Sequence, residues 1–408
     1  MRIAIIGSGI AGLTTAYLLR NHDCELFEAK PFLALAGHGL ELNNGSLIDI
    51  PLRVIHPHYY PKLLSLCKEL KVDLRKLEHS GSFKLAKDSE RFEYSSIPLL
   101  NKRYNFVKPN WNNVKLGSLF MYFYHLCQKH KSNKDYDFIS FSEFLVKYRI
   151  SKRLSNTILY PLLSSICTCS YAELDRFPAR VLLEMMATIA GPIPMERFYA
   201  GTHDIENALI KHLSKVHLSS KVQKVIISDT GGEIHLNGEI RHFDHIVMAT
   251  EAHLVKNLLE KNKHTMGVLS ELNTIPYKQT DTVVHTVDST HELIKAEKSL
   301  HYEEHPVGGQ AQASMWLNKV EPHLNLKEQT MQTWNPYDCF VDNELKRSTL
   351  NRALITVESY QAVKRLQSFV HPSFSLSGSY LAKGVPLLEG GVESAYRICD
   401  YLKSRSKV

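Results

Sequence analysis

The sequence has no long uninterrupted apolar segment. Outside the first twenty residues, no stretch approaches the ~20 apolar residues that a membrane-spanning helix needs. The opening segment is mostly apolar up to Leu19, but Gly7, Gly9 and Gly12 interrupt it, so a membrane anchor or a signal peptide is not the best interpretation. We therefore expect a soluble cytoplasmic protein.

Several motifs that define other classes of protein are also missing. There is no Gly-x-Ser-x-Gly elbow, no phosphate loop ending in Gly-Lys-Ser or Gly-Lys-Thr, and no paired zinc-ligand signature. The seven cysteines are scattered, and Cys167 and Cys169 lack the second pair that a structural zinc site requires, so we expect reduced thiols. His56 and His58 are two ligands without a third. We predict no metal site and no nucleic-acid partner.

Charge is unevenly distributed along the chain. The formal net charge is +7, and residues 101–160 hold 11 Lys or Arg against 3 Asp or Glu, interleaved with aromatic residues. This segment either attracts an anionic membrane surface or an acidic ligand, or is only a solvated basic face, and the sequence leaves these alternatives open. The length of 408 residues and the 44% hydrophobic content predict a large core divided between two domains.

A glycine motif near the N-terminus predicts a nucleotide site. Arg2–Ile6 is typical of a strand buried on both faces, and Ile10–Arg20 has helical spacing, so the glycines lie between a strand and a helix. In that context the first glycine permits a tight turn, the second lets the backbone approach a pyrophosphate, and the third lets helix and strand pack closely. The residues expected at the phosphates are Gly7, Ser8, Gly9, Ile10, Ala11 and Gly12.

The second expected strand, Cys24–Phe27, ends in an acidic residue. Glu28 follows Gly7 by 21 residues, where a carboxylate can accept hydrogen bonds from both ribose hydroxyls of an adenosine, and Ala29 lies beside it. An arginine there would indicate a 2′-phosphate, so the motif disfavours NADP and leaves FAD and NAD equally allowed.

The rest of the chain divides into two parts with different patterns of apolar residues. Residues 73–198 show helix-type patterning without clear strand alternation, and we assign them to a second domain. From Gly201 onward, short strands joined by glycine turns suggest a β-meander. The expected elements are helices at Ile205–Leu213 and Glu393–Leu402 and strands at Val222–Ser228, Glu233–Leu236, His245–Ala249, Tyr277–Asp288 and Leu354–Glu358.

The C-terminal segment SLSGSYLAKGVPLLEGGVES, residues 375–394, closely resembles the closing signature of the flavin-containing amine oxidase superfamily. In that family a strand ends at a glycine, and the next helix begins at a small-residue step beneath the flavin. The resemblance implies FAD as the cofactor, with a helix dipole that stabilises negative charge on the reduced ring. The residues that it assigns to the cofactor are Gly378, Ser379, Gly390, Gly391 and Val392.

Further segments extend the resemblance over most of the chain. Phe198–Leu209 is similar to a glycine-led helix of the family, Ser220–Val225 to the strand that receives adenine at Val222, and Ile246–Thr250 to a strand that ends at Ala249. A narrower resemblance is to bacterial predicted NAD/FAD-binding proteins related to amine oxidases. Its segments are Asp49, Tyr59–Pro61, Tyr160–Leu163, Arg176–Ala179, Val283–Asp288, Trp316–Asn318 and Trp334–Pro336.

The loop after the second strand departs from the family pattern. Flavin amine oxidases usually place an arginine before a Gly-Gly pair there, whereas this chain has only Gly37 followed by His38. We expect these two residues at the cofactor, with Lys30 in place of the arginine's phosphate contact. Ser379 stands where the family has an acidic residue, and Pro51 lies where the subgroup has a glycine.

The predicted fold class is α/β. A Rossmann-like FAD-binding domain, with a parallel sheet and a β-meander, is expected from residues 1–75, 200–275 and 345–408, and an inserted α+β substrate domain from residues 76–199 and 276–344. The resemblance implies an oxidoreductase that moves hydride from an amine, or from an activated C–H or C–C bond of a small or lipid-like molecule, to flavin N5. The alternatives are a flavin-dependent isomerase or mutase and a flavin-free interaction protein.

Two polar residues lie near the expected substrate side. His285 either contacts substrate or is satisfied inside the core, and Lys278 lies near the domain crossover, where some amine oxidases hold a lysine beside flavin N5. The local spacing around Lys278 does not match that family, and hydride transfer to a flavin needs no obligatory side-chain base. We therefore predict no particular catalytic side chain.

Overall fold

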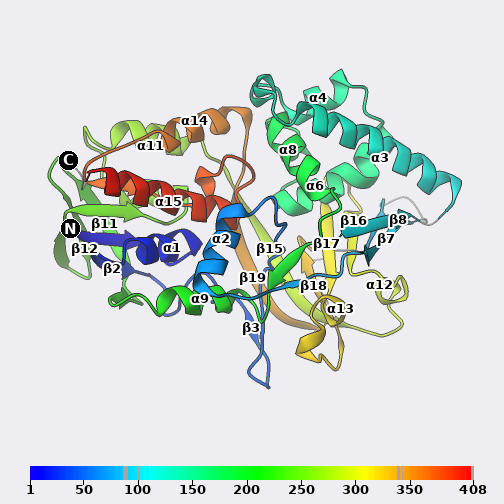
Figure 1. The fold of residues 1–408 in the computed structure, drawn as a ribbon, viewed down its shortest axis with the longest axis horizontal. Helices are drawn as coiled ribbons and strands as arrows, with labels where there is room; N and C mark the ends of the chain where they lie inside the picture. The colour runs from blue at the N-terminus through cyan, green and yellow to red at the C-terminus, as the bar shows by residue number, and fades with distance from the viewer. Residues whose placement is uncertain (86–90, 100–101, 108, 338–340, 342, 406–408) are drawn as a thin grey trace.

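A computed structural model describes residues 1–85, 91–99, 102–107, 109–337, 341 and 343–405. Its first layer is a parallel five-stranded sheet that lies at the end of the molecule where both termini are found (Figure 1). In spatial order the strands are β10 (Val216–His217), β2 (Asp23–Phe27), β1 (Arg2–Ile6), β14 (His245–Met248) and β20 (Phe374–Leu376). The two ends of the chain and its middle therefore build one sheet.

The parallel sheet is buried between helices and a β-meander. Every residue of β14 is buried, and all of β1 except Arg2, which explains why these strands read as continuous apolar runs. The meander has the predicted antiparallel order: β11 (Val222–Ile227), β12 (Gly232–Leu236) and β13 (Glu239–Phe243). The helices of this half of the molecule are α1 (Ile10–Leu18), α2 (Pro61–Leu70), α9 (Thr202–Ile210), α10 (Ala252–Leu258), α11 (Met266–Asn273), α14 (Val357–Gln367) and α15 (Leu388–Arg405).

The second layer is a mixed eight-stranded sheet in the other half of the molecule (Figure 1). Only the pairing of β16 with β6 is parallel. Its order is β19 (Glu344–Ala353), β15 (Tyr277–Val287), β18 (Gln329–Trp334), β17 (Ala311–Trp316), β16 (Leu300–Glu304), β6 (Gly81–Lys84), β7 (Arg91–Leu99) and β8 (Lys102–Val107). Two short pairs complete the strands: β3 (Leu40–Glu41) with β4 (Leu47–Ile48), and β5 (Leu74–Lys76) with β9 (Glu196–Phe198).

Helices cover one side of this second sheet. They are α3 (Trp111–His130), α4 (Phe141–Lys147), α5 (Lys152–Leu154), α6 (Tyr160–Cys167), α7 (Tyr171–Leu174) and α8 (Ala179–Ile189), with short helices α12 (Glu292–Lys295) and α13 (Leu317–Val320) at the other edge. Within the described residues, no helix is both long and apolar enough to cross a membrane. The predicted division into two discontinuous domains stays a prediction.

Two expectations about elements were wrong. Leu354–Glu358 is not a strand, because β19 ends at Ala353 and Thr356 caps α14 by accepting a hydrogen bond from the backbone N–H of Ser359. The segment 73–198 contains strands β5 to β9 as well as helices. The β7–β8 hairpin was missed because its outer face carries charged and aromatic residues in place of the usual polar alternation.

Candidate functional site

The glycine motif lies at the carboxyl end of β1, which is the central strand of the parallel sheet. Gly7 has φ +109°, and an added Cβ would lie 2.7 Å from the carbonyl oxygen of Ala249. A Cβ on Gly12 would lie 1.9 Å from the carbonyl oxygen of Gly7. At Gly9, by contrast, an added Cβ meets no atom of the other described residues within 4 Å, apart from its chain neighbours and the backbone of its own helix. Two of the three glycines thus allow close packing, and the third faces open space.

The start of α1 is free to receive an anion. Gly9 is the N-cap residue, and no side chain caps the helix there. The first backbone N–H groups of a helix lack partners within the helix and carry the positive end of its dipole. Open space in front of an uncapped helix N-terminus matches the place where a pyrophosphate binds in dinucleotide folds.

Glu28 directly follows β2, and its carboxylate already accepts hydrogen bonds from neighbouring residues. One carboxylate oxygen accepts the backbone N–H of Ser8 at 3.1 Å and its hydroxyl at 2.5 Å, and the other accepts the N–H of Lys30 at 2.9 Å. The Ser8 hydroxyl in turn accepts the N–H of Ala34 at 2.8 Å, which holds it in place. A carboxylate offers about four acceptor positions, so one is left for a ribose hydroxyl.

Neighbouring segments bring the predicted adenosine residues together. The N–H of Ser220 donates to the carbonyl of Glu28 at 2.7 Å, and the N–H of Ser219 donates to that of Lys30 at 2.9 Å. These bonds hold the start of β11, and with it Val222, beside Glu28 and Ala29. Contact of any of these residues with a nucleotide stays a prediction.

The C-terminal glycines serve packing between protein elements. An added Cβ on Gly390 would lie 2.5 Å from the Cβ of Ala382, and one on Gly391 would lie 2.7 Å from Ile10 Cγ2. The helix also begins two residues before the glycines, at Leu388. Both glycines are therefore small because α15 presses against the preceding loop and against α1, where Val392 and Ala11 are also buried. Close approach to a flavin ring is an additional prediction.

The same region holds the predicted Gly378 and Ser379. The N–H of Gly378 donates to Ser394 Oγ at 2.9 Å, so the end of β20 is tied to the second turn of α15. The carbonyl oxygen of Ser379 lies 3.0 Å from the place of a Cβ on Gly390.

The loop that departs from the family pattern is held by side chains. Lys30 Nζ lies 3.0 Å from His38 Nε2, and burial together with the nearby Lys30 charge lowers the pKa of His38. A Cβ on Gly37 would lie 2.1 Å from the ring of Phe32. The N–H of Ala36 donates to Glu206 at 2.8 Å. Lys30 thus reaches the loop where the missing arginine would stand.

A cavity of about 860 Å³ lies between the second sheet and the helices that cover it. On one side it is lined by Pro51–Val54 and by Leu387 and Leu388, immediately before the α15 glycines. Its walls come mainly from strands β6 to β8 and β16 to β18 and from helices α3, α6 and α8, and they are mostly aliphatic and aromatic. A volume of this size is typical of a small-molecule site.

The charged residues of the cavity all carry the same sign. Arg53, Arg103 and Arg352 line it, and among the described residues no Asp or Glu does. The side chains of Arg53 and Arg352 make no hydrogen bond or ion pair with another described residue, although the backbone of Arg352 belongs to the β15–β19 ladder. Burial, and then the charge of Arg352, lowers the pKa of Arg53 to about 10. The cavity is therefore electropositive as well as apolar.

Comparison with known proteins supports the nucleotide-binding fold. Residues 5–70 match the model of the NAD(P)-binding Rossmann-like domain family. Zeta-carotene desaturase from Synechocystis is 25% identical over 318 residues, which is 68% of this chain and 63% of that protein. 3-amino-4-hydroxybenzoate 2-monooxygenase from Streptomyces cremeus is 46% identical over 59 residues, 14% of each chain. The chain thus spans less than two thirds of either curated relative.

Solved structures match over nearly the whole chain. Putrescine oxidase bound to putrescine has a TM-score of 0.72 at 13% identity, covering 98% of both chains, and cyclohexylamine oxidase from Brevibacterium oxydans also has 0.72, at 12% identity over 98% and 99%. A fatty acid isomerase from P. acnes has a TM-score of 0.69 at 15% identity over 99% and 98%. The chain therefore has the fold that these amine oxidases share. The predicted α/β fold class is confirmed, and the likeness agrees with the predicted flavin amine oxidase superfamily, with FAD and with an oxidoreductase.

The arginines of the cavity and His56, which also lines it, were not identified from the sequence. Arg53, Arg103 and Arg352 come from distant segments, and no local spacing relates them. His56 was noted only beside His58, but it is 3% exposed and lines the cavity, whereas His58 is exposed. The signal that could have found these residues is a charged side chain within a strand or an apolar segment.

The two other polar candidates have partners within the protein. His285 Nε2 lies 2.9 Å from the hydroxyl of Thr333, and the residue is 8% exposed, so it is a satisfied buried histidine. Lys278 Nζ lies 3.6 Å from the carboxylate of Glu173. Neither residue lines the large cavity.

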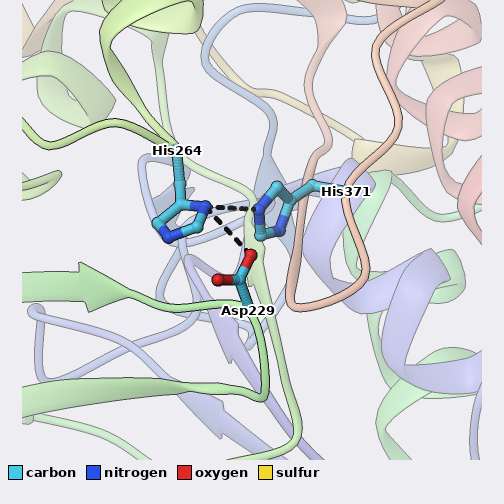
Figure 2. Close-up of side chains that lie close together, drawn as sticks. All are labelled: Asp229, His264 and His371. Atoms are coloured by element: carbon cyan, nitrogen blue, oxygen red, sulfur yellow. Dashed lines mark hydrogen bonds and ion pairs between the residues drawn. The ribbon is translucent and has the colours of Figure 1, made fainter.

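Figure 2 shows the one group in the described part of the chain with a metal-like set of donors: Asp229, His264 and His371. His264 Nδ1 lies 3.3 Å from His371 Nε2 and 3.5 Å from Asp229 Oδ1. However, His371 Nδ1 accepts the N–H of Ser373 at 3.1 Å, so in the neutral ring Nε2 keeps its proton and donates to His264. Metal-bound histidines instead donate their second N–H. The two histidines are therefore a hydrogen-bonded pair beside Asp229, and the absence of a metal stays a prediction.

Proposed function

We propose that the chain binds FAD through the predicted residues and oxidises an apolar substrate held in the large cavity. Gly9 and the uncapped start of α1 would receive the pyrophosphate, and Glu28 and Val222 the adenosine. The observation that carries the proposal is the open space in front of Gly9, because its two partner glycines are closed by protein atoms.

The cavity indicates how the chain would use the cofactor. When bound, FAD supplies the hydride acceptor. The apolar walls would exclude water and hold the substrate against the side lined by Pro51, Leu387 and Leu388, and Arg53 and Arg352 would stabilise negative charge that accumulates there on reduction. No described side chain in the cavity has to act as a base for this chemistry.

Charge decides between the substrates left open by the sequence. An ammonium group would meet three guanidinium groups and no carboxylate among the described lining residues. An activated C–H or C–C bond in an uncharged or anionic molecule suits the cavity better than an amine does. Isomerisation without net oxidation is the second candidate, favoured by the likeness to the fatty acid isomerase.

The test begins with the visible spectrum and the FAD content of the purified protein. We expect a flavin spectrum with close to one FAD per chain, and a much weaker affinity in Gly9→Ala at an unchanged melting temperature, because the added methyl occupies only open space. The matched control, Gly12→Ala, should lose stability with or without FAD, since its methyl overlaps the Gly7 carbonyl.

Three outcomes separate the candidate functions. Anaerobic bleaching of the flavin by an apolar substrate supports oxidation, and product formed without a lasting change of redox state supports isomerisation. A colourless protein that does not take up added FAD, or a Gly9→Ala variant with normal FAD affinity, would refute the proposed binding site.

A further inference from the structure

Arg103 is a buried cation that has no counterion among the residues that the structure describes. It is 6% exposed, and its Nε and Nη1 atoms have no hydrogen-bond partner in the described part of the chain. Its Nη2 makes only long bonds, of 3.3 and 3.4 Å, to the carbonyls of Ile189 and Gly191. Burying an unpaired charge is expensive, so a guanidinium in this position is expected to meet an anion during function.

Two histidines lie within electrostatic range of Arg103 in the same cavity wall. Both ring nitrogens of His56 lack a hydrogen-bond partner among the described residues, and His79 shares a hydrogen bond with the hydroxyl of Tyr94 at 3.1 Å. Burial, followed for His79 by the charge of Arg103, lowers the pKa of His56 to about 4 and that of His79 to about 3. At neutral pH both are uncharged, so they add a hydrogen-bond donor without adding charge.

The register of the hairpin directs this group inward. Arg103 pairs with Pro98 across β7 and β8, and the face that it shares with Tyr94 and Val107 lines the cavity. We propose that Arg103, with His56 and His79 beside it, binds the carboxylate of a substrate whose long apolar chain fills the rest of the cavity. This inference rests on the proposed function, since it names the substrate class of the same site.

The remaining lining fits a flexible acyl chain. Five of the nine methionines of the protein line the cavity, namely Met121, Met185, Met186, Met195 and Met315. Methionine adapts to irregular apolar ligands better than branched or aromatic residues do. A single guanidinium with neutral neighbours matches a monoanion, and its planar fork matches a carboxylate.

The test compares ligands that share a chain and differ in the head group. Oleate, oleyl alcohol, oleylamine and oleyl phosphate are titrated calorimetrically into the protein as purified. We expect oleate to bind at least about tenfold more tightly than the alcohol, as a charge-assisted contact predicts, and oleylamine to bind more weakly than either. Arg103→Met should reduce the preference for oleate over the alcohol to within about twofold and should not lower the melting temperature.

The controls decide where the anion sits. Arg365→Met, which lies outside the cavity, should keep the preference for oleate, and if Arg53→Met loses the preference while Arg103→Met keeps it, the assignment to Arg103 is wrong. Tighter binding of oleylamine or of oleyl phosphate than of oleate overturns the carboxylate. If Arg103→Met does not fold, Arg103→Lys, which keeps the charge but not the fork, should show an intermediate preference.

FAD content, measured on the same samples, separates this inference from the proposed function. A protein that binds oleate with the expected preference but takes up no FAD would refute the flavin chemistry and leave the carboxylate site standing. A protein that binds FAD but does not distinguish oleate from oleyl alcohol would refute the carboxylate site and leave the proposed flavin chemistry standing.

A second inference comes from the surface where the cavity opens. Val114, Ser118 and Met121 follow one another at helical spacing on α3, line the cavity and are exposed to solvent, and Trp111, one turn earlier, is 81% exposed. The outer face of the adjoining β7–β8 hairpin adds exposed Ile97, Leu99, Tyr104 and Phe106. These elements lie together at the end of the molecule opposite the parallel sheet (Figure 1).

The charge of this surface identifies its partner. Exposed Lys102 and Lys115 stand among the apolar residues, within the segment that holds 11 basic and 3 acidic residues. Apolar and aromatic side chains with lysines are typical of proteins that lie on anionic bilayers. We infer that α3 and the β7–β8 hairpin dock on an anionic membrane, from which an acyl substrate enters the cavity.

Vesicle sedimentation tests the docking surface. The full-length protein should sediment with phosphatidylcholine vesicles that contain phosphatidylglycerol and much less with phosphatidylcholine alone, and 0.5 M salt should weaken binding. Trp111→Asp combined with Met121→Asp should abolish it, whereas Val307→Asp, at a residue 83% exposed elsewhere, should not. Equal binding by all three proteins, or no binding to anionic vesicles, refutes the inference. Conversion of a dimer to a monomer by the double variant would assign the surface to a second copy.

Discussion

Arg197 is the most deeply buried charged side chain in the described structure, and its removal should cost the fold several kcal/mol. It is 1% exposed and lies between two carboxylates, contacting Glu321 closely and Asp49 at 3.2 Å. Arg75 also pairs with Glu321 at 2.5 Å, and Asp49 accepts the N–H of Thr202 at 2.9 Å. This network joins the start of α9 to the β5–β9 pair, to the end of α13 and to the loop after β4.

The size of the effect follows from the partners left behind. In Arg197→Met, Glu321 keeps Arg75 and Asp49 keeps one backbone donor, but each loses its buried cation. Removing one partner of a buried ion pair costs about 3–5 kcal/mol. For a chain of this length the unfolding entropy is about 0.9 kcal/mol/K, so the melting temperature should fall by about 3–6 °C.

The pH dependence gives a sharper check on the same variant. Burial raises the pKa of Glu321 to about 7, against the opposing pull of Arg197 and Arg75. Without Arg197 that pKa rises further, so at pH 5.5 Glu321 binds a proton in the folded variant and the missing cation matters less. The deficit of Arg197→Met should therefore be smaller at pH 5.5 than at pH 8.

Thermal unfolding of wild type and variants at several pH values measures both effects. Arg365→Met, which breaks an exposed pair with Glu271, should leave the melting temperature unchanged and serves as the control. Adding Glu321→Gln to Arg197→Met should recover part of the loss. A deficit below about 1 kcal/mol, or one that does not change between pH 5.5 and 8, would refute the account of Arg197 as a buried counterion.

Three further predictions concern the cavity, one carboxylate and one helix contact. Gly117→Phe should abolish oleate binding without unfolding the protein, because its Cβ position on α3 is open and faces the cavity, whereas Gly267→Phe, equally open but on α11, should bind normally in the same titration. Burial raises the pKa of Glu206 to about 6. The protonated carboxyl therefore contributes up to about 2 kcal/mol to the free energy of unfolding below pH 4.5, and this contribution is lost as the pH rises through 6. In Glu206→Gln, the free energy of unfolding measured in denaturant should lack this dependence on pH. Gly391→Val should lower the free energy of unfolding by about 1–3 kcal/mol in urea titrations, because the new side chain overlaps α1, and a smaller loss would contradict that packing.

The parts of the fold that could be predicted were those specified by local pattern. The buried strands β1 and β14 read as continuous apolar runs, and the meander was marked by its glycine turns, Gly231 and Gly238, which have φ +157° and +82°. The hairpin of β7 and β8 carried no such pattern, because one of its faces points into a cavity and the other is exposed and aromatic.

The candidate site divides in the same way. Gly7, Gly9 and Gly12 could be found because the tight strand–turn–helix connection expected of a dinucleotide motif fixes their spacing, and the phosphate contact itself stays a prediction. Arg53, Arg103 and Arg352 are separated by dozens to hundreds of residues and meet only because β8, β19 and the loop after β4 surround one space. No local rule relates such residues, and the property that they share, a guanidinium without an ion pair to any described carboxylate, is visible only in three dimensions.

The parallel sheet is completed only by β20 and α15, which are synthesised last, and this affects the nascent chain on the ribosome. At about 5–20 residues per second, some 20–75 s separate the emergence of α1 from that of α15 on the ribosome. Throughout that interval the side chains of Ile10 and Ala11, which α15 later covers, are exposed to solvent. The backbone groups at the edge of β14 that later pair with β20 are unpaired during the same time. A nascent or prematurely terminated chain therefore presents an unfinished sheet to chaperones and proteases, and a stop codon before residue 374 should be as damaging as a deletion at the N-terminus.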